Sequence, residues 1–295
     1  MNPMAIKRRV FSSIVNIYSQ AAALIKRNAV VFYPFAAFAA VEALALTFLF
    51  LIPREPFVRL FGPPVRTFWG EQFLHYPFNF LLLPKLAYFS RTVLSIIIGS
   101  FTTGMAVILI VQDHKKMALK LAPSFKQAVK RYASFFMVTV VVVFLLFFGM
   151  RLVTSTILKY FMAGHARFLF IGARLWLGPI LTVLGFLAAI LVQACFVYAV
   201  PLIVIDGKKA IKALAGSFIF FKKNFFITIF LVTLPMLIFI PFIILQQNSA
   251  FLVEKFFPEI ILIILYAGIL LNSIIIDFLV TTSATIFYLK NRQEK

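Results

Sequence analysis

Two acidic residues stand inside apolar stretches that are long enough to cross a lipid bilayer. Only nine of the 295 residues are Asp or Glu, and Glu42 and Asp277 are the two within such stretches. A charge at bilayer depth costs at least ~2.5 kcal/mol on insertion scales, so an acid there is a functional candidate by default. At the usual rise per residue, each is expected on the order of 15 to 20 Å from the cytoplasmic end of its helix.

Equal depth allows these two acids to be neighbours. In that case they share a proton or line a polar cavity together with Asn272 and Gln193, an arrangement that suits proton-coupled transport. The other interpretation is a protonated or hydrogen-bonded packing contact. The sequence therefore predicts an intramembrane polar site of these four residues and leaves its role open.

No pattern indicates catalysis, so no catalytic residue, metal or cofactor is expected and the chain is not predicted to be an enzyme. His75, His114 and His165 are isolated, and no zinc-protease helix, serine elbow or phosphate-binding glycine loop occurs. The pair Asp113–His114 favours a polar contact at a helix end. Cys195 is the only cysteine, which excludes a disulfide within the chain.

The composition indicates which solvent surrounds these residues. Of the chain, 63% is hydrophobic and 13% charged, with a mean hydropathy of +1.02. A soluble domain of this length needs a largely polar exterior, whereas lipid accepts Leu, Ile, Phe and Val. The net charge of +20 favours anionic lipid headgroups as partners over nucleic acid, because the basic residues form short runs between apolar stretches.

Six apolar stretches fit the length of a membrane-spanning helix. The expected fold class is an all-α polytopic membrane helix bundle in a single transmembrane domain, residues 1–295. The basic N-terminus, Met1 to Arg9, does not lead into the hydrophobic core of a signal peptide. The predicted spans are Ala29–Leu51, Phe89–Val111, Phe135–Ile157, Leu175–Ile205, Phe225–Leu245 and Ile260–Tyr288.

The flanking charges predict the orientation. Nineteen Lys and Arg residues lie in the N-terminal segment, the second and fourth connections and the tail, against ten on the other side. The richer side is expected to be cytoplasmic, with both termini inside, in the plasma membrane of a bacterium, the inner membrane. The poorer side includes Arg54, Arg59, Arg66, Lys85, Arg91, Arg151, Lys159, Arg167, Arg174 and Lys255.

Prolines and aromatic residues mark two further features. Prolines inside spans are expected to kink them, which is common in transporters and in other membrane bundles alike; they are Pro34, Pro179, Pro201, Pro235 and Pro241. The connection from Ile52 to Tyr88 is rich in proline and aromatic residues. It is expected to anchor in the outer interface, or to form a lid over a lipid-facing groove.

Basic amphipathic helices are predicted before three of the spans. Ile211, Leu214, Phe218 and Phe221 share one helical face in the segment 206–224, and Asp206 is a plausible N-cap. A stripe of Val10, Ile14, Ile17, Ala21 and Leu24 precedes the first span, and 124–132 is a shorter version. The residues expected at the lipid surface are Lys208, Lys209, Lys212, Lys222, Lys223, Lys26 and Arg27.

These helices suggest a threefold internal repeat of an in-plane helix followed by two spans, in units 5–112, 116–205 and 206–290. The alternative is that cytoplasmic loops simply end in basic residues. The stretch from Phe196 through Pro201 to Asp206–Gly207, followed by Ala210 to Phe225, resembles the YciC-like proteins and the membrane domain of some glycerophosphodiester phosphodiesterases. The resemblance implies a prokaryotic six-span fold and supplies no catalytic domain.

Two functions remain from the sequence. The first is a structural or accessory role in the cell envelope through lipid or partner contacts. The second is a transporter, proton-coupled if the acids titrate, of a small or amphipathic solute. A polar cavity reaching Glu42 and Asp277 would favour transport, and a filled apolar core would favour the accessory role.

Overall fold

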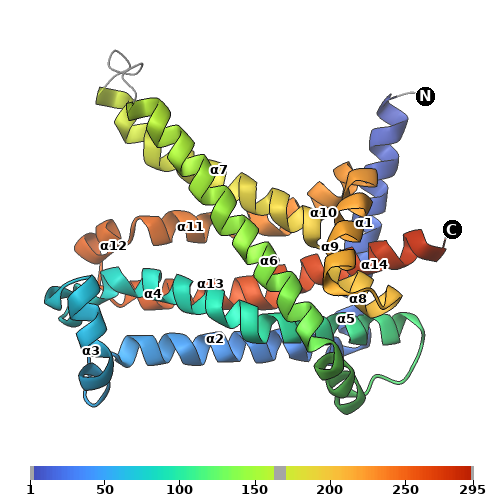
Figure 1. Ribbon diagram of the computed structural model, residues 1–295, viewed down its shortest axis with the longest axis horizontal. Coiled ribbons are helices and arrows are strands. Elements are labelled where there is room, and N and C mark those ends of the chain that lie inside the picture. Colours follow the sequence, from blue (N-terminus) through green and yellow to red (C-terminus); the bar gives the residue numbers. More distant parts are fainter. Residues whose placement is uncertain (1–2, 163–170, 294–295) are drawn as a thin grey trace.

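The computed structural model describes residues 3–162 and 171–293, so His165 and Arg167 lie outside the described residues. Within these ranges every regular element is a helix (Figure 1). The elements are α1 (Pro3–Arg27), η1 (Ala29–Phe32), α2 (Tyr33–Leu51), α3 (Phe57–Phe68), η2 (Glu71–Leu74), α4 (Asn79–Leu94), η3 (Ser95–Gly99), α5 (Ser100–His114), α6 (Leu121–Met162), α7 (Ile171–Phe196), α8 (Ala199–Asp206), α9 (Ala210–Lys223), α10 (Phe225–Leu237), α11 (Ile240–Gln247), α12 (Ser249–Lys255), α13 (Ile260–Ile269), η4 (Leu270–Ile276) and α14 (Asp277–Gln293).

The prediction of an all-α membrane bundle is confirmed. Five helices are long and apolar enough to cross a membrane, and the pair α9 and α10, bent by 102°, supplies a sixth span when counted as one. The five are Ala29–Leu51, Asn79–His114, Leu121–Thr156, Ile180–Asp206 and Ile260–Gln293. Because α9 turns away from α10 by more than a right angle, α10 carries the apolar span and continues into α11.

Both termini lie at one end of the molecule, beside α1 and α9 (Figure 1). We call this the terminal end, and the opposite end, which holds α3 and α12, the α3 end. Figure 1 shows α2, α4 to α5 and α13 to α14 running side by side between the two ends, while α1 and α3 run across them. This arrangement fits in-plane helices at both surfaces of a bilayer.

Helix α1 packs against the bundle through its predicted stripe. Ile14, Ile17, Ala21 and Leu24 are buried, and they join a core formed with α5, α8 and α14. The side chain of Val10, the first residue of the predicted stripe, lies outside the described part. The apolar face of α1 therefore faces protein.

On α9 only part of the predicted apolar face is buried against the bundle. Ala213, Ser217 and Phe221 are buried, whereas Ile211 is 78% and Phe218 40% exposed. The small residues let α9 approach its neighbours closely, and the Ser217 hydroxyl donates to the backbone oxygen of Cys195 at 2.8 Å. Ile211 and Phe218 thus face outward with the lysines.

Two expectations about helix boundaries are corrected. Pro34 does not kink the first span, because it lies in the first turn of α2, where no intrahelical partner is lost. The second span begins at Asn79, and Pro84 lies inside it, so Lys85 and Arg91 belong to α4 and not to an outer loop. Much of the connection 52–88 is helical, in α3, η2 and the first turns of α4.

The third predicted in-plane segment, 124–132, is the first part of α6, which runs on as one helix to Met162. Three of the four prolines in the fourth and fifth spans accompany interruptions, whereas Pro179 lies within α7, which continues through it. A turn separates α7 from α8 just before Pro201, and α10 ends after Pro235, with Pro241 in the first turn of α11. These breaks leave the affected spans segmented near the middle of the bundle.

Candidate functional site

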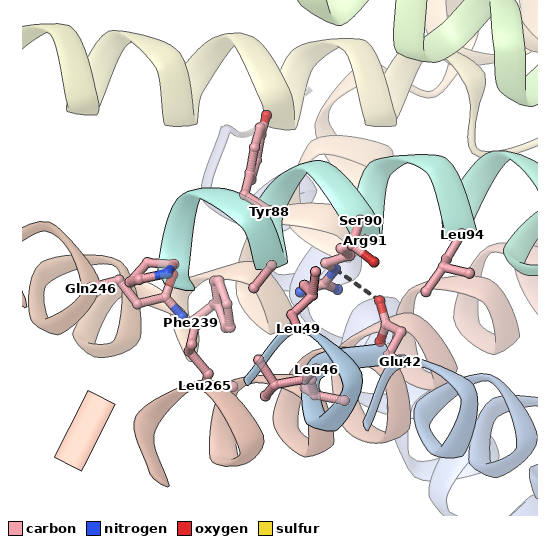
Figure 2. A pocket seen from close by; sticks show the side chains of 14 residues that line it. Glu42, Leu46, Leu49, Tyr88, Ser90, Arg91, Leu94, Phe239, Gln246 and Leu265 are labelled. Atoms are coloured by element: carbon pink, nitrogen blue, oxygen red, sulfur yellow. Dashed lines mark ion pairs between the residues drawn. The ribbon is translucent and has the colours of Figure 1, made fainter. Parts of the chain in front are cut away.

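A buried ion pair lies in the middle of the bundle. Arg91 of α4 approaches Glu42 of α2, with 3.2 Å between Nε and Oε1, and the Glu42 side chain is only 2% exposed (Figure 2). The hydroxyl of Ser273, in η4, donates to the second oxygen of the Glu42 carboxylate. Because burial makes an unpaired charge costly, Arg91 and Ser273 together permit a carboxylate at this depth.

Asp277 lies beside this pair. The amide of Asn272 donates to Asp277 Oδ2 at 3.3 Å. The charge of Arg91 acts on both carboxylates, and that of Asp277 acts on Glu42. Together these five residues form what we call the charged layer: Glu42, Arg91, Asn272, Ser273 and Asp277.

Two π-helical segments build this layer. Asn272 and Ser273 belong to η4, which ends immediately before Asp277, and η3 begins four residues after Arg91. A π-helix shifts backbone bonding by one residue, and such segments are frequent at functional sites. Side chains satisfy the affected carbonyls of η3: Ser100 donates to Ile96 at 2.7 Å, and Tyr132 of α6 donates to Ile97 at 2.9 Å.

One cavity reaches the charged layer from the α3 end, and we call it the α3-side cavity. Its volume is about 210 Å³, and Glu42 and Arg91 lie on its wall with Tyr88, Ser90 and Gln246 (Figure 2). The remaining wall is apolar and includes Leu46, Leu49 and Leu265. Helix α3 contributes no lining residue, whereas Pro84, Ala87 and Tyr88 of the connection 52–88 line the cavity as part of α4.

A second cavity, the terminal-side cavity, contains Asp277. It measures about 260 Å³ and is also lined by Gln193, so the structure brings this predicted pair to one space. Hydroxyl side chains line part of it: Ser95, Ser100, Thr102, Thr103, Thr139 and Thr281. Its apolar wall includes Phe35, Phe38 and Phe196.

The two cavities follow one another along the same three spans. On each span the residues of the α3-side cavity lie nearer the α3 end than those of the terminal-side cavity. The α3-side cavity is lined by residues within 42–49 of α2, 84–94 of α4 and 265–269 of α13. The terminal-side cavity is lined by residues within 35–38 of α2, 95–103 of η3 and α5, and 277–281 of α14. The charged layer and both π-helical segments lie where one set passes into the other. The layer therefore lies between two cavities that follow one another along these spans.

At the terminal end, the predicted lipid-surface residues fall into two groups. Lys26, Lys209, Lys212 and Lys223 are exposed. The others have partners within the chain: Arg27 pairs with Asp113, Lys208 lies 3.7 Å from Asp206, and Lys222 lies over the Phe218 ring. Asp113 also accepts from Asn28, which fits the expected helix-end contact, and His114 lies 3.2 Å from Gln293.

The segment that carries the family resemblance forms a junction at this end. Arg131 of α6 donates to the backbone oxygens of Ile203 and Val204, both at 2.7 Å. Asp206 ends α8 instead of capping the next helix, and accepts from Tyr288 at 2.7 Å. Gly207 follows at φ +65°, the left-handed conformation that favours glycine at a helix C-terminus.

A partly buried tyrosine joins α1 to this end of the bundle. The Tyr18 hydroxyl donates to the backbone oxygen of Leu231 on α10 at 2.8 Å. Burial raises the pKa of Tyr18 above its ordinary value, so the hydroxyl keeps its proton and remains a donor.

Arg91 is the site residue that sequence reasoning misplaced. It stands two residues inside the predicted second span, yet its charge suggested the outer surface. A signal was present, because a buried glutamate requires a cation and Arg91 is close to an apolar stretch. Without the arrangement of helices, no pattern links Arg91 to Glu42.

These features define an all-α, multi-pass membrane protein with a charged layer between two cavities. Comparisons with protein-family models, curated proteins and solved structures found no match to this chain. The functional argument therefore rests on the geometry of the charged layer and its cavities.

Proposed function

We propose that this protein is a transporter of a small amphipathic solute. The observation that carries the proposal is the order of the two cavities along the same three spans, with the charged layer between them. Each cavity combines an apolar wall with a few polar groups, which is typical of sites for small amphipathic molecules. Closing one cavity while the other is open is the geometry that alternating access requires.

The layer and the helix breaks supply the moving parts of this proposal. The Glu42–Arg91 pair spans α2 and α4, and Asp277 follows the π-helical end of the sixth span. Phe239, at the break between α10 and α11, lines the α3-side cavity, and Val197, at the break between α7 and α8, lines the terminal-side cavity. Broken helices at mid-membrane depth are where transporters place binding sites and hinges.

Cysteine accessibility tests this proposal without knowledge of the solute. Cys195 is the only cysteine, so Cys195→Ala gives a background for Ala87→Cys in the α3-side cavity and Thr103→Cys in the terminal-side cavity. A membrane-impermeant maleimide is added to intact cells and to inverted vesicles. We expect Ala87→Cys to react from the α3 side and Thr103→Cys from the terminal side.

Two matched variants make the result interpretable. Leu44→Cys on the outer face of α2, 70% exposed to lipid, should not react, and Lys209→Cys should react from the terminal side. Substitution of Glu42 by Gln should shift the two cavity reactivities in opposite directions, because it weakens the layer. Unreactive cavity cysteines alongside a reactive Lys209→Cys would refute transport through these cavities.

An accessory role through lipid or partner contacts is the second candidate. The exposed lysines of the terminal end favour it, since they can bind anionic headgroups without any movement of the bundle. We further propose that the protein lies in a bacterial plasma membrane with the terminal end in the cytoplasm, and that it catalyses no covalent chemistry. The lysine distribution supports this orientation.

A further inference from the structure

The charged layer holds one more acid than base. Glu42 pairs with Arg91, so these two charges cancel, whereas Asp277 has no ion pair within 4 Å in the part of the chain that the structure describes. Its partner is the neutral amide of Asn272, and it opens into the terminal-side cavity. An ionised Asp277 therefore gives this cavity a net negative charge. The low dielectric constant of the interior strengthens the attraction between this charge and a cation.

Three of the six hydroxyl side chains that line this cavity present acceptors. Ser100 donates its proton to the backbone oxygen of Ile96 at 2.7 Å, Thr102 to that of Gly99 at 3.1 Å, and Thr139 to that of Phe135 at 3.1 Å. A hydroxyl has a single proton and two lone pairs, so a donor already engaged with the backbone offers only lone pairs elsewhere. At Ser100, Thr102 and Thr139 the wall thus favours a ligand that donates hydrogen bonds.

The apolar side of the cavity also favours a cation of organic character. Phe35, Phe38 and Phe196 line it, and apolar walls of this kind pack against the apolar part of a ligand. A bare metal ion would meet carbon on this side, where it needs oxygen ligands. An anion would meet Asp277 and the lone pairs of the hydroxyls, and it would be repelled.

We infer that the terminal-side cavity binds the ammonium group of a small amphipathic organic cation, with the nitrogen against Asp277 and the apolar part against the phenylalanines. This assignment rests on the proposed transport function and names its substrate class. The charge of Arg91 also acts on Asp277, but Arg91 forms its ion pair with Glu42.

Binding of benzylammonium chloride to the purified full-length protein in detergent tests the assignment. Benzyl alcohol is the neutral probe and sodium benzoate the anionic one, all at an ionic strength held constant with sodium chloride. We expect benzylammonium alone to raise the melting temperature in a saturable way. Asp277→Asn should weaken its apparent Kd at least ~10-fold, because a charge-assisted hydrogen bond is lost.

Asp113→Asn provides the matched control, since it makes the same chemical change at an acid outside the cavity. It should keep the apparent Kd within about twofold of the parent protein. Thr139→Val removes one acceptor and should weaken binding ~2- to 10-fold. If Asp277→Asn does not fold, Thr139→Val and Gln193→Leu are tested in its place. No saturable shift, an equal shift with benzyl alcohol or benzoate, or an undiminished Kd in these variants would overturn the assignment.

The two experiments fail independently. Reactive cavity cysteines without benzylammonium binding would leave a transporter for another class of solute. Benzylammonium binding with unreactive cavity cysteines would leave a cation-binding membrane protein that does not transport.

Discussion

At the scale of single residues, the Glu42–Arg91 pair shows how this chain tolerates charge at bilayer depth. The Glu42 side chain is 2% and the Arg91 side chain 28% exposed, so the glutamate is almost fully enclosed, although both residues line the α3-side cavity. Each charge offsets the desolvation cost of the other, and the Ser273 hydroxyl adds a hydrogen bond to the carboxylate. The pair is therefore a unit, and its energy cannot be divided between the two residues.

Arg91→Leu is expected to lower the free energy of unfolding by about 3–5 kcal/mol, because it leaves the Glu42 carboxylate buried without a cation. Unfolding in mixed micelles with increasing dodecyl sulfate measures this change. The double variant Glu42→Leu with Arg91→Leu should recover most of the loss, since neither charge remains. A double variant as unstable as Arg91→Leu alone would contradict this account.

Arg59→Leu is the comparison on the surface. Arg59 pairs with Glu55 at 3.0 Å, with both side chains mostly exposed. Its removal should cost less than about 1 kcal/mol, because water screens the exposed pair.

The sequence could identify Glu42 and Asp277 because a charge in an apolar stretch is conspicuous in one dimension. It could not identify the pairing, since Glu42 depends on Arg91 and Ser273, which lie 49 and 231 positions away in the chain. Asn272 and Gln193 were foreseen as polar partners: Asn272 donates to Asp277, and Gln193 lines the same cavity as Asp277. Proton sharing between the two acids stays a prediction.

At the scale of elements, small residues decide which helices meet. Gly104 of α5 lies against the ring of Phe135 on α6, and both are buried. A Cβ at this position would come closer to the ring than van der Waals radii allow. The contact therefore fixes the approach of α5 and α6 beside the terminal-side cavity, to which both helices contribute.

Gly104→Ala is expected to destabilise the protein by about 1–3 kcal/mol, because the added methyl group overpacks this contact. Gly149→Ala on α6, where nothing lies within 4 Å, should be neutral. The same micelle unfolding compares the two, and Gly104→Ala combined with Phe135→Leu should regain part of the loss. If both single variants are equally stable, α6 moves away from the added methyl group at no cost in folding free energy.

Element positions were foreseen better than element ends. Apolar length predicted the spans, since about 20 apolar residues cross a bilayer whatever their neighbours. The prolines of the aromatic connection 52–88 suggested a loop. In the structure, however, Pro63 and Pro64 lie within α3 and Pro84 lies within α4. The π-helical segments leave no sequence signature, because their extra residue is accommodated by packing.

At the scale of the whole molecule, the termini and the exposed lysines share one end, and the arrangement of the spans agrees with an even number of crossings (Figure 1). The proposed orientation places this end in the cytoplasm. The opposite end holds α3, whose exposed Leu60 and Phe68 suit a lipid interface, and Ile52, Val65, Leu74 and Leu82 pack it onto its neighbours. The threefold repeat remains a prediction.

A C-terminal reporter fusion tests the orientation. Alkaline phosphatase fused after Lys295 should be inactive and green fluorescent protein at the same site fluorescent, because only the second folds in the bacterial cytoplasm. A phosphatase insertion after Gly70, in the connection at the α3 end, should be active. Phosphatase activity at the C-terminus would reverse the orientation while leaving the bundle unchanged.

The polar bonds that join separate helices are unevenly distributed between the two ends. At the terminal end Arg131 of α6 donates to a backbone oxygen of α8, Asp206 of α8 accepts from Tyr288 of α14, and Arg27 of α1 pairs with Asp113 of α5. Toward the α3 end, Thr47 meets Tyr266 at 2.6 Å and Gln247 meets Thr182 at 2.9 Å, both between neutral groups. Charge-assisted bonds are stronger than neutral ones, so in the proposed transport cycle we expect opening at the terminal end to have the higher activation barrier. A solute-carrying cycle would then be kinetically asymmetric, with exchange at the α3 end fast and release at the terminal end setting the turnover.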